Sequence, residues 1–322
     1  MNRRFLALCA LLVIVNPSAL GQTFPTKPVR IIMNYTPGGP TDLIARTVGG
    51  KLQELTGQPF LIENMPSATG AVGTQAMARS APDGYTMMYS TPGHTTMGLA
   101  LYEEKLGFDP FRDITPVAML VNSTQMIVAH PALGVKSIPE LVALAKSKPG
   151  QLNYGSVGVG TSTQLGIELL KSMAGIDMVH VPYKGTAPVM QDLLAGRVHV
   201  VLNSLPTIIQ YVRAGKLVAL AVGSTTRSAA APDIPTMEEL GYKGFQVSTW
   251  GAFFVPAKTP AAIVARLNAL TNQALVDPQV VKTLTAQGTE LTPTTTEAFS
   301  RLMREEYERW KKVIIEAKIA PE

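Results

Sequence analysis

Two glycine-rich stretches of the sequence combine residue types that suit the binding of an anion. The first runs Tyr35-Thr36-Pro37-Gly38-Gly39-Pro40-Thr41-Asp42, and the second runs Ser156-Val157-Gly158-Val159-Gly160-Thr161-Ser162-Thr163. Glycine lets the backbone approach a ligand closely, and the first turn of a helix offers unpaired N–H groups with a positive partial charge. If each stretch joins a strand to a helix, the pair predicts two surfaces that present N–H groups to one carboxylate or phosphate.

Each stretch also has a plainer interpretation. It can be an ordinary strand-to-helix turn, with Thr41 or Asp42 as the N-cap of the first helix. A single stretch favours that interpretation. Two such stretches, one in each predicted domain, favour a ligand held between them.

Sequence patterns of enzymes, metal sites and nucleic-acid binders are missing. The chain has no His-Glu-x-x-His motif, no Cys/His cluster and no Walker loop, and residues 154–158 lack the first glycine of a Gly-x-Ser-x-Gly elbow. The basic residues are scattered and only 6% of the residues are aromatic, so neither a basic stripe nor a stacking surface is indicated. We therefore expect no catalytic residue, no cofactor, no metal ion and no binding to nucleic acid.

Strand-like and helix-like segments alternate along the 322 residues, 46% of which are hydrophobic. This alternation predicts an α/β fold with largely parallel sheets. A long amphipathic helix is predicted over Glu297–Lys318, and its apolar stripe suits docking against the rest of the protein. The predicted buried strands are Val29–Tyr35, Phe60–Glu63, Thr86–Ser90, Val117–Leu120, Gln125–Ala129, Leu152–Val157, Val179–Tyr183, His199–Leu202, Val218–Val222 and Gly251–Val255.

The first 21 residues have the composition of a secretory signal peptide. Two arginines precede the apolar run Phe5–Val15, and Ala19-Leu20-Gly21 offers small residues for cleavage before Gln22. The run is too short for a membrane span of about 20 residues. The only cysteine, Cys9, lies inside it, so the mature chain has no disulfide and no thiol. We expect a soluble protein exported to a bacterial periplasm.

Short motifs along nearly the whole mature chain carry a family resemblance. Beside Pro37-Gly38-Gly39-Pro40-Thr41-Asp42, they are Phe24-Pro25-Thr26-Lys27-Pro28-Val29-Arg30, Ile62-Glu63-Asn64, Ala81-Pro82-Asp83-Gly84-Tyr85-Thr86, Lys148-Pro149-Gly150, Gly158-Val159-Gly160, His180-Val181-Pro182-Tyr183-Lys184-Gly185 and Pro232-Asp233-Ile234-Pro235-Thr236. In this order and spacing they closely resemble the Bug-type periplasmic solute-binding proteins of tripartite tricarboxylate transporters.

The resemblance implies a two-lobed, type II periplasmic binding fold, with two doubly wound sheets joined by a hinge. A small carboxylate would lie in the cleft between the lobes. The two glycine-rich loops would clasp it through backbone N–H groups and ordered water, and Asp42 would cap its helix and position water. The loaded protein, expected to be a monomer, would deliver its ligand to a membrane permease.

The sequence departs from the family pattern at three places. Gln164 stands where a histidine often follows the second loop, and Met65-Pro66-Ser67 stands where Arg-Pro-Gly often follows Glu-Asn. Asn203 stands where an acidic residue often follows a strand. A neutral Asn203 leaves the cleft less negative and can donate a hydrogen bond to a second ligand carboxylate, or it only holds the turn before Pro206.

Other polar residues follow predicted strands, where ligands bind in doubly wound sheets. The candidates for contact with the variable end of the ligand are Ser90, Thr91, His94 and Thr95, and His94 can instead cap a local helix. Tyr35 can wall the ligand or be a core tyrosine with a satisfied hydroxyl. Tyr183 and Lys184 can contact the ligand or only shape the rim of the second domain.

We predict domain 1 at residues 22–123 and 247–322 and domain 2 at residues 124–246, with the hinge at Asn122-Ser123-Thr124 and Gln246–Trp250.

The ligand can be a dicarboxylate, an aromatic acid or an acidic amino acid. Two other functions stay open. One is a hydrolase of carboxylate esters, which the missing elbow and thiol disfavour. The other is a ligand-loaded partner of a sensor receptor, which needs the same closed clamp as transport.

Overall fold

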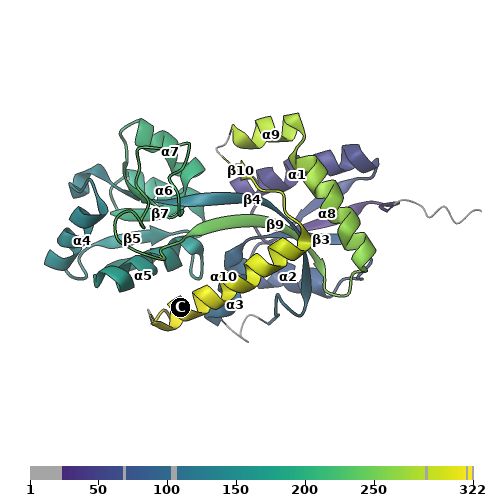
Figure 1. Cartoon of the computed structure of the whole chain (residues 1–322), viewed down its shortest axis with the longest axis horizontal. Coiled ribbons are helices and arrows are strands. Elements are labelled where there is room, and N and C mark those ends of the chain that lie inside the picture. The colour runs from purple at the N-terminus through teal and green to yellow at the C-terminus, as the bar shows by residue number, and fades with distance from the viewer. Residues whose placement is uncertain (1–23, 68–69, 103–106, 287–288, 317, 321–322) are drawn as a thin grey trace, which may run out of the picture.

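The computed structural model describes residues 24–67, 70–102, 107–286, 289–316 and 318–320, so the predicted signal peptide lies outside the described residues. Figure 1 shows two lobes, each built from strands with helices packed on them. The strands are β1 (Val29–Met33), β2 (Phe60–Asn64), β3 (Thr86–Ser90), β4 (Ile114–Ala129), β5 (Asn153–Ser156), β6 (Val179–Pro182), β7 (Val200–Ser204), β8 (Val218–Val222), β9 (Ser248–Pro256) and β10 (Glu290–Leu291). The helices are α1 (Pro40–Thr56), α2 (Ala71–Ala78), α3 (Thr96–Tyr102), α4 (Ile138–Ser147), α5 (Ser162–Ala174), α6 (Thr186–Leu194), α7 (Leu205–Arg213), α8 (Ala261–Leu275), α9 (Pro278–Thr285) and α10 (Thr296–Glu316), with short 3-10 turns η1 (Pro92–His94) and η3 (Pro131–Leu133).

The sheet of the first lobe has the strand order β2-β1-β3-β9-β4. Strand β1 pairs in parallel with β2 and β3, whereas β9 runs antiparallel to β3 and β4. Successive side chains of a strand point to opposite faces. Ile31 accordingly packs in the cluster under α1, α8 and α9, and Ile32 packs in the cluster under α2 and α10. Helices therefore cover both faces of this sheet.

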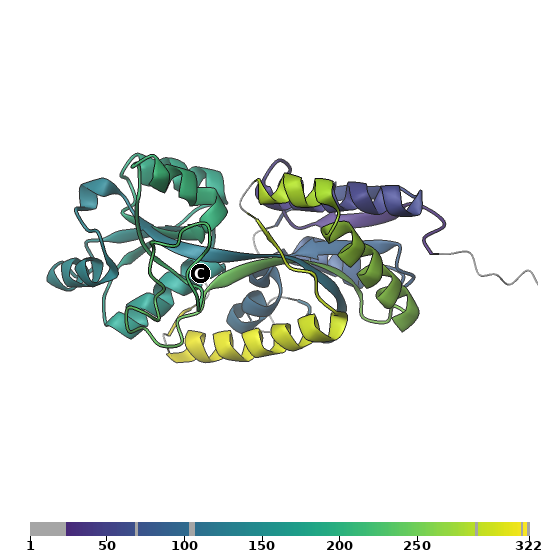
Figure 2. The ribbon, with the colours of Figure 1, turned by 45° about the horizontal axis from the view of Figure 1, so that its top comes forward.

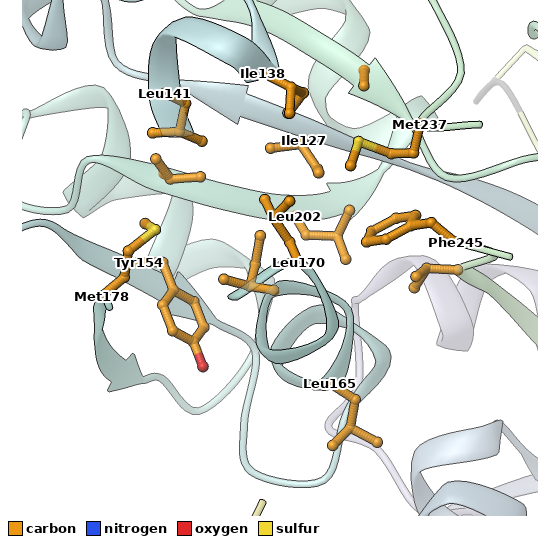
Figure 3. Close-up of a cluster of buried hydrophobic side chains, with 14 of the residues drawn as sticks. Ile127, Ile138, Leu141, Tyr154, Leu165, Leu170, Met178, Leu202, Met237 and Phe245 are labelled. Carbon is orange, nitrogen blue, oxygen red and sulfur yellow. The ribbon is translucent and has the colours of Figure 1, made fainter. Parts of the chain in front are cut away.

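The sheet of the second lobe continues from β4 in the order β4-β7-β5-β6, with β8 also beside β4. Strands β5, β6 and β7 are parallel, and β7 and β8 run antiparallel to β4. Helices α4 and α5 cover one face, and α6 and α7 cover the other. Figure 3 draws part of the first of these cores, in which Leu202, Ile127 and Leu170 lie next to one another. Two doubly wound sheets joined through β4 confirm the predicted fold class.

Strand β4 is longer than the sequence predicts. The prediction of two separate strands, Val117–Leu120 and Gln125–Ala129, is wrong, because a single strand runs from Ile114 to Ala129. Ser123 lies opposite Thr249 of β9, so the backbone groups of these polar residues stay paired although their side chains are half-exposed. Figures 1 and 2 show β4 and β9 running together from one lobe into the other. One predicted domain limit, between residues 123 and 124, falls within β4, and the other, between residues 246 and 247, falls just before β9; both stay predictions.

Helix α10 packs on both lobes, along the edge seen in Figures 1 and 2. Phe299 and Met303 lie in a core of the first lobe, and Trp310 and Ile314 lie in a core of the second. The predicted apolar stripe is therefore a docking surface, but it also contains a buried Glu306. Among the residues that the structure describes, no helix is both long enough and apolar enough to cross a bilayer.

Candidate functional site

The first glycine-rich loop turns the chain from β1 into α1. Gly38 has a φ of 84°, in the left-handed region that favours glycine, and Gly39 is the N-cap of α1. Pro40 takes the first helical position, where its missing N–H costs nothing. No side chain caps this helix, so the interpretation of Thr41 or Asp42 as its N-cap is wrong. Asp42 is the third helical residue.

Asp42 shapes this loop from within the first turn of α1. Its buried carboxylate accepts hydrogen bonds from the Gly38 N–H (3.1 Å), Arg46 Nε (2.8 Å) and Asn64 Nδ2 (3.2 Å). Asn64 Nδ2 also lies 2.9 Å from the carbonyl oxygen of Tyr35, to which it donates. Burial opposes ionisation of Asp42, but the hydrogen bonds from these three donors outweigh it and hold the pKa below its usual range. The ionised carboxylate therefore fixes the path of the loop.

The donors that this loop can offer an anion lie just after Gly38. The N–H groups of Gly39, Thr41 and Asp42 have no hydrogen-bond partner within the described part of the chain. They sit at the start of α1, where the helix dipole adds positive potential. The Gly38 N–H, by contrast, is already used by Asp42.

Side chains tie the second loop together in a similar way. Thr163 Oγ1 accepts from the Val157 N–H at 3.0 Å, and Ser156 Oγ accepts from the Gly158 N–H at 3.2 Å. Thr161 Oγ1 donates to the Gly158 carbonyl at 2.6 Å. Gly158 has a φ of 142°, which side chains rarely adopt. Hydroxyl groups thus hold a backbone path that needs glycine.

Gln164 uses up the Gly160 N–H, which donates to Gln164 Oε1 at 2.7 Å. Helix α5 begins two residues earlier, at Ser162, with Thr161 as its N-cap. The N–H groups of Thr161, Ser162 and Thr163 make no hydrogen bond to the residues that the structure describes. The start of α5 is therefore the part of this loop that can receive an anion.

A serine–histidine pair lies beneath the second loop. Ser156 Oγ is 2.7 Å from His180 Nε2, and Gln164 Nε2 is 3.3 Å from His180 Nδ1. Because the Gln164 oxygen accepts from Gly160, its amide nitrogen is the atom that faces Nδ1. The Ser156 hydroxyl also has the Gly158 carbonyl as an acceptor, at 3.2 Å. A serine nucleophile needs its hydroxyl to donate to the histidine instead.

A segment of the first lobe forms a wall beside the first loop. This wall segment, Thr91–Thr96, runs from the end of β3 through η1 to the first residue of α3. The Tyr35 hydroxyl lies 2.5 Å from Thr91 Oγ1, and the Tyr35 ring stacks on His94 with ring centroids 4.8 Å apart. Tyr35 therefore joins the first loop to the wall segment.

The wall segment also meets the second loop, across the lobes. A Cβ placed on Gly93 would lie 3.6 Å from the carbonyl oxygen of Gly160 and 3.6 Å from Cα of Thr161. The structure thus brings Tyr35, Thr91 and His94 together with both glycine-rich loops. A Cβ at these distances would make ordinary van der Waals contacts, so position 93 lies against the second loop without a requirement for glycine.

The wall segment is electrically neutral near neutral pH. His94 is 8% exposed, and burial lowers its pKa to about 4. His94 Nδ1 has no hydrogen-bond partner within the described ranges. Burial raises the pKa of Tyr35, although its hydrogen bond to Thr91 acts in the other direction. An anion at this place would meet polar groups and helix termini instead of a cationic side chain.

Three other predicted site residues have partners of their own. Ser90 is fully buried, with its Oγ 3.4 Å from Nδ2 of Asn34. The Tyr183 hydroxyl donates to Asp192 Oδ2 at 2.7 Å. Asn203 is 4% exposed at the end of β7, its Oδ1 accepts the next backbone N–H, and its Nδ2 finds no partner in the described part of the protein. Ligand contacts by these three residues stay predictions.

The sequence prediction missed residues that shape the loops. Arg46 follows Asp42 by one helical turn, a spacing typical of ion pairs, and this signal was readable. Asn64 and Gly93 come from other segments, and no local pattern indicates their contacts.

No cluster of three metal-ligating side chains occurs among the described residues. A surface hollow of about 520 Å³ beside Phe108 and Tyr307 contains none of the predicted site residues.

Comparison with known proteins places this geometry in a family. Residues 44–319 match the model of the tripartite tricarboxylate transporter family receptor. BugT of Bordetella pertussis is 35% identical over 295 residues, which cover 91% of this chain and 90% of BugT. MatC from Rhodopseudomonas palustris, solved with bound malate, is 32% identical with a TM-score of 0.82, covering 90% of this chain and 100% of that one. A second R. palustris protein, solved with adipate, is 33% identical with a TM-score of 0.84, covering 93% of this chain and 100% of that one. The chain therefore belongs to the receptor family of the tripartite tricarboxylate transporters and is a Bug-type protein.

Proposed function

We propose that this protein is a periplasmic solute-binding protein that holds a small carboxylate between its two glycine-rich loops. The observation that carries the proposal is the contact of the wall segment with both loops, through Tyr35 on one side and Gly93 on the other. Each loop leads into a helix whose first N–H groups have no partner among the described residues. Two helix N-termini that share one site suit a single anion.

The molecules bound to two relatives support a carboxylic acid with two acid groups. MatC was solved with malate and the second R. palustris protein with adipate, and both ligands are dicarboxylates. In the present protein one carboxylate would bind the N–H groups of Thr41, Asp42 and the first turn of α5. The other end would face the wall segment, with Asn203 as a candidate donor. Dicarboxylates are therefore the first ligands to test, followed by aromatic acids and acidic amino acids.

Charge recognition in this proposal rests on fixed dipoles. Arg46 lies nearby, but its Nε donates to Asp42, so the two side chains largely neutralise each other. The remaining donors are neutral backbone groups and hydroxyls. Such donors need little rearrangement on binding, because the side chains of Asp42 and Gln164 already hold the loops in place.

We infer binding without turnover. The pair of Ser156 and His180 resembles a catalytic pair, but Ser156 is fully buried and its hydroxyl has the Gly158 carbonyl as an acceptor. A nucleophile must reach the substrate and give its proton to a base, and a buried serine that is bonded to a carbonyl does neither. Family membership supports delivery of the ligand to a membrane permease, after export and cleavage behind Gly21.

A thermal-shift screen tests the proposed function. Adipate and malate are compared with uncharged diols of the same carbon chain length, added to the purified mature protein. An acid present at about 100 times its Kd should stabilise the protein by about 2.7 kcal/mol. The matched diol should give no shift, because it lacks the charge that the N–H groups recognise. Equal shifts from acid and diol, or no shift from any acid in a broad panel, would contradict the proposal.

A further inference from the structure

Helix α10 carries a carboxylate where its apolar stripe should continue. Met303, Glu306 and Trp310 follow one another at helical spacing, and all three are buried. Burying a carboxylate costs free energy unless donors compensate it. None of the ligand contacts proposed above involves Glu306, so its position calls for another explanation.

Two donors from different parts of the fold meet at one oxygen of Glu306. Thr96 Oγ1 donates to Oε2 at 2.7 Å, and Trp250 Nε1 donates to the same oxygen at 3.0 Å. Thr96 is the last residue of the wall segment. Trp250 lies in β9 opposite Asn122 of β4, in the pair of strands that crosses between the lobes. One buried oxygen therefore joins the wall segment to the crossing strands.

The rest of the wall segment is fixed relative to this anchor. Thr95 Oγ1 donates to the Thr91 carbonyl at 2.9 Å, and the Thr95 N–H donates to the Pro92 carbonyl at 3.0 Å. These short-range bonds make the segment a compact unit. A shift at Thr96 would therefore be passed on to His94 and to the contact of Gly93 with the second loop.

We propose that Glu306 is a positioning residue for ligand capture, which holds the wall segment against the strands that join the lobes. The inference rests on the proposed function, because the wall segment matters for binding only if the ligand lies between the two loops. Glu306 itself does not touch the ligand. It acts through Thr96 and Trp250.

Four variants of the mature protein test this role. Glu306→Leu keeps the apolar shape and removes the acceptor, whereas Glu306→Gln keeps a carbonyl oxygen for both donors. Thr96→Val removes one donor with little change of shape and is the second test should Glu306→Leu fail to fold. Leu284→Ala is the control, because it removes a fully buried side chain of α9 on the opposite face of the first-lobe sheet.

The first measurement is hydrogen exchange of the wall segment in the protein without ligand. Both Glu306→Leu and Thr96→Val remove the hydrogen bond that holds Thr96, and the loss of one such bond of ordinary net strength should raise the exchange rate of the wall segment about tenfold in each. Glu306→Gln and the distant Leu284→Ala should stay within about threefold of the wild type. Wild-type exchange in both Glu306→Leu and Thr96→Val, or an equal rise in Leu284→Ala, would overturn the inference.

The second measurement is calorimetry with malate and adipate as probes. Glu306→Leu should bind the better probe about tenfold more weakly than the wild type, and Glu306→Gln should restore binding. Wild-type affinity in Glu306→Leu would overturn the positioning role even if exchange had risen. If the wild type bound no carboxylic acid, the proposed function would fail instead, and the exchange data alone would decide whether Glu306 anchors the segment.

Discussion

Replacing His94 by phenylalanine should remove an acid-sensitive part of the protein's stability. Burial lowers the pKa of His94 from 6.5 to about 4 in the folded chain, and in the unfolded chain the pKa returns to about 6.5. As the pH falls through this window the unfolded state takes up a proton and the folded state does not, so stability is lost as the pH falls. Phenylalanine keeps a ring against Tyr35 and cannot titrate.

The interval between the two pKa values sets the size of the effect. At about 1.4 kcal/mol per pH unit, the wild type should lose about 3 kcal/mol more than the variant between neutral pH and pH 4. Urea unfolding of both proteins across this range measures the difference, and groups common to both cancel. Parallel pH profiles would refute the reasoning, because they would mean that His94 takes up its proton equally well in the folded chain.

Three further changes have definite expected outcomes. Asp42→Ala should weaken binding of the carboxylate and lower the free energy of unfolding by about 1–3 kcal/mol, since the Gly38 N–H and Arg46 lose their acceptor. Calorimetry that gave unchanged affinity would show that Asp42 does not shape the site. Gly39→Val should fold normally, because a Cβ at this position has no neighbour within 4 Å, but it should lose the ligand. Gly160→Val should lose both ligand binding and stability, because φ is 74° there and a Cβ would lie 3.1 Å from Leu101. Thermal melts and binding assays separate these cases, and full affinity in Gly39→Val would remove the first loop from the site. The exported protein should begin at Gln22, and N-terminal sequencing that found an unprocessed chain would contradict this.

Much of the fold was predictable because short apolar runs lie between turn residues. Strands β3 and β8 have the bounds that the sequence indicates. The prediction failed at β4, where the polar residues Asn122-Ser123-Thr124 separate two predicted strands. Pairing with β9, which comes from a distant part of the sequence, keeps those residues in a strand. Only contacts between distant segments decide such a case, and a local pattern does not contain them.

The candidate site was predictable in its loops and not in its hydrogen bonds. Glycines and hydroxyl residues indicated both loops, and the structure brings them to one wall segment. Which N–H groups remain available depends on Asp42 and Gln164, whose side chains occupy the N–H groups of Gly38 and Gly160. Glu306 was passed over because a single acidic residue on a helix usually faces solvent. Its burial follows from Thr96 and Trp250, which the sequence does not place beside it.

The carboxylate clamp is tested most directly by calorimetry with a bound dicarboxylic acid and its dimethyl ester. The acid should bind, and solution scattering should show a more compact particle with the acid than without it. The ester should bind about a hundredfold more weakly or not at all, because loss of two charged hydrogen bonds costs about 3 kcal/mol. Equal affinity for acid and ester would contradict the clamp, and conversion of the ester to the acid by the pure protein would show an enzyme instead.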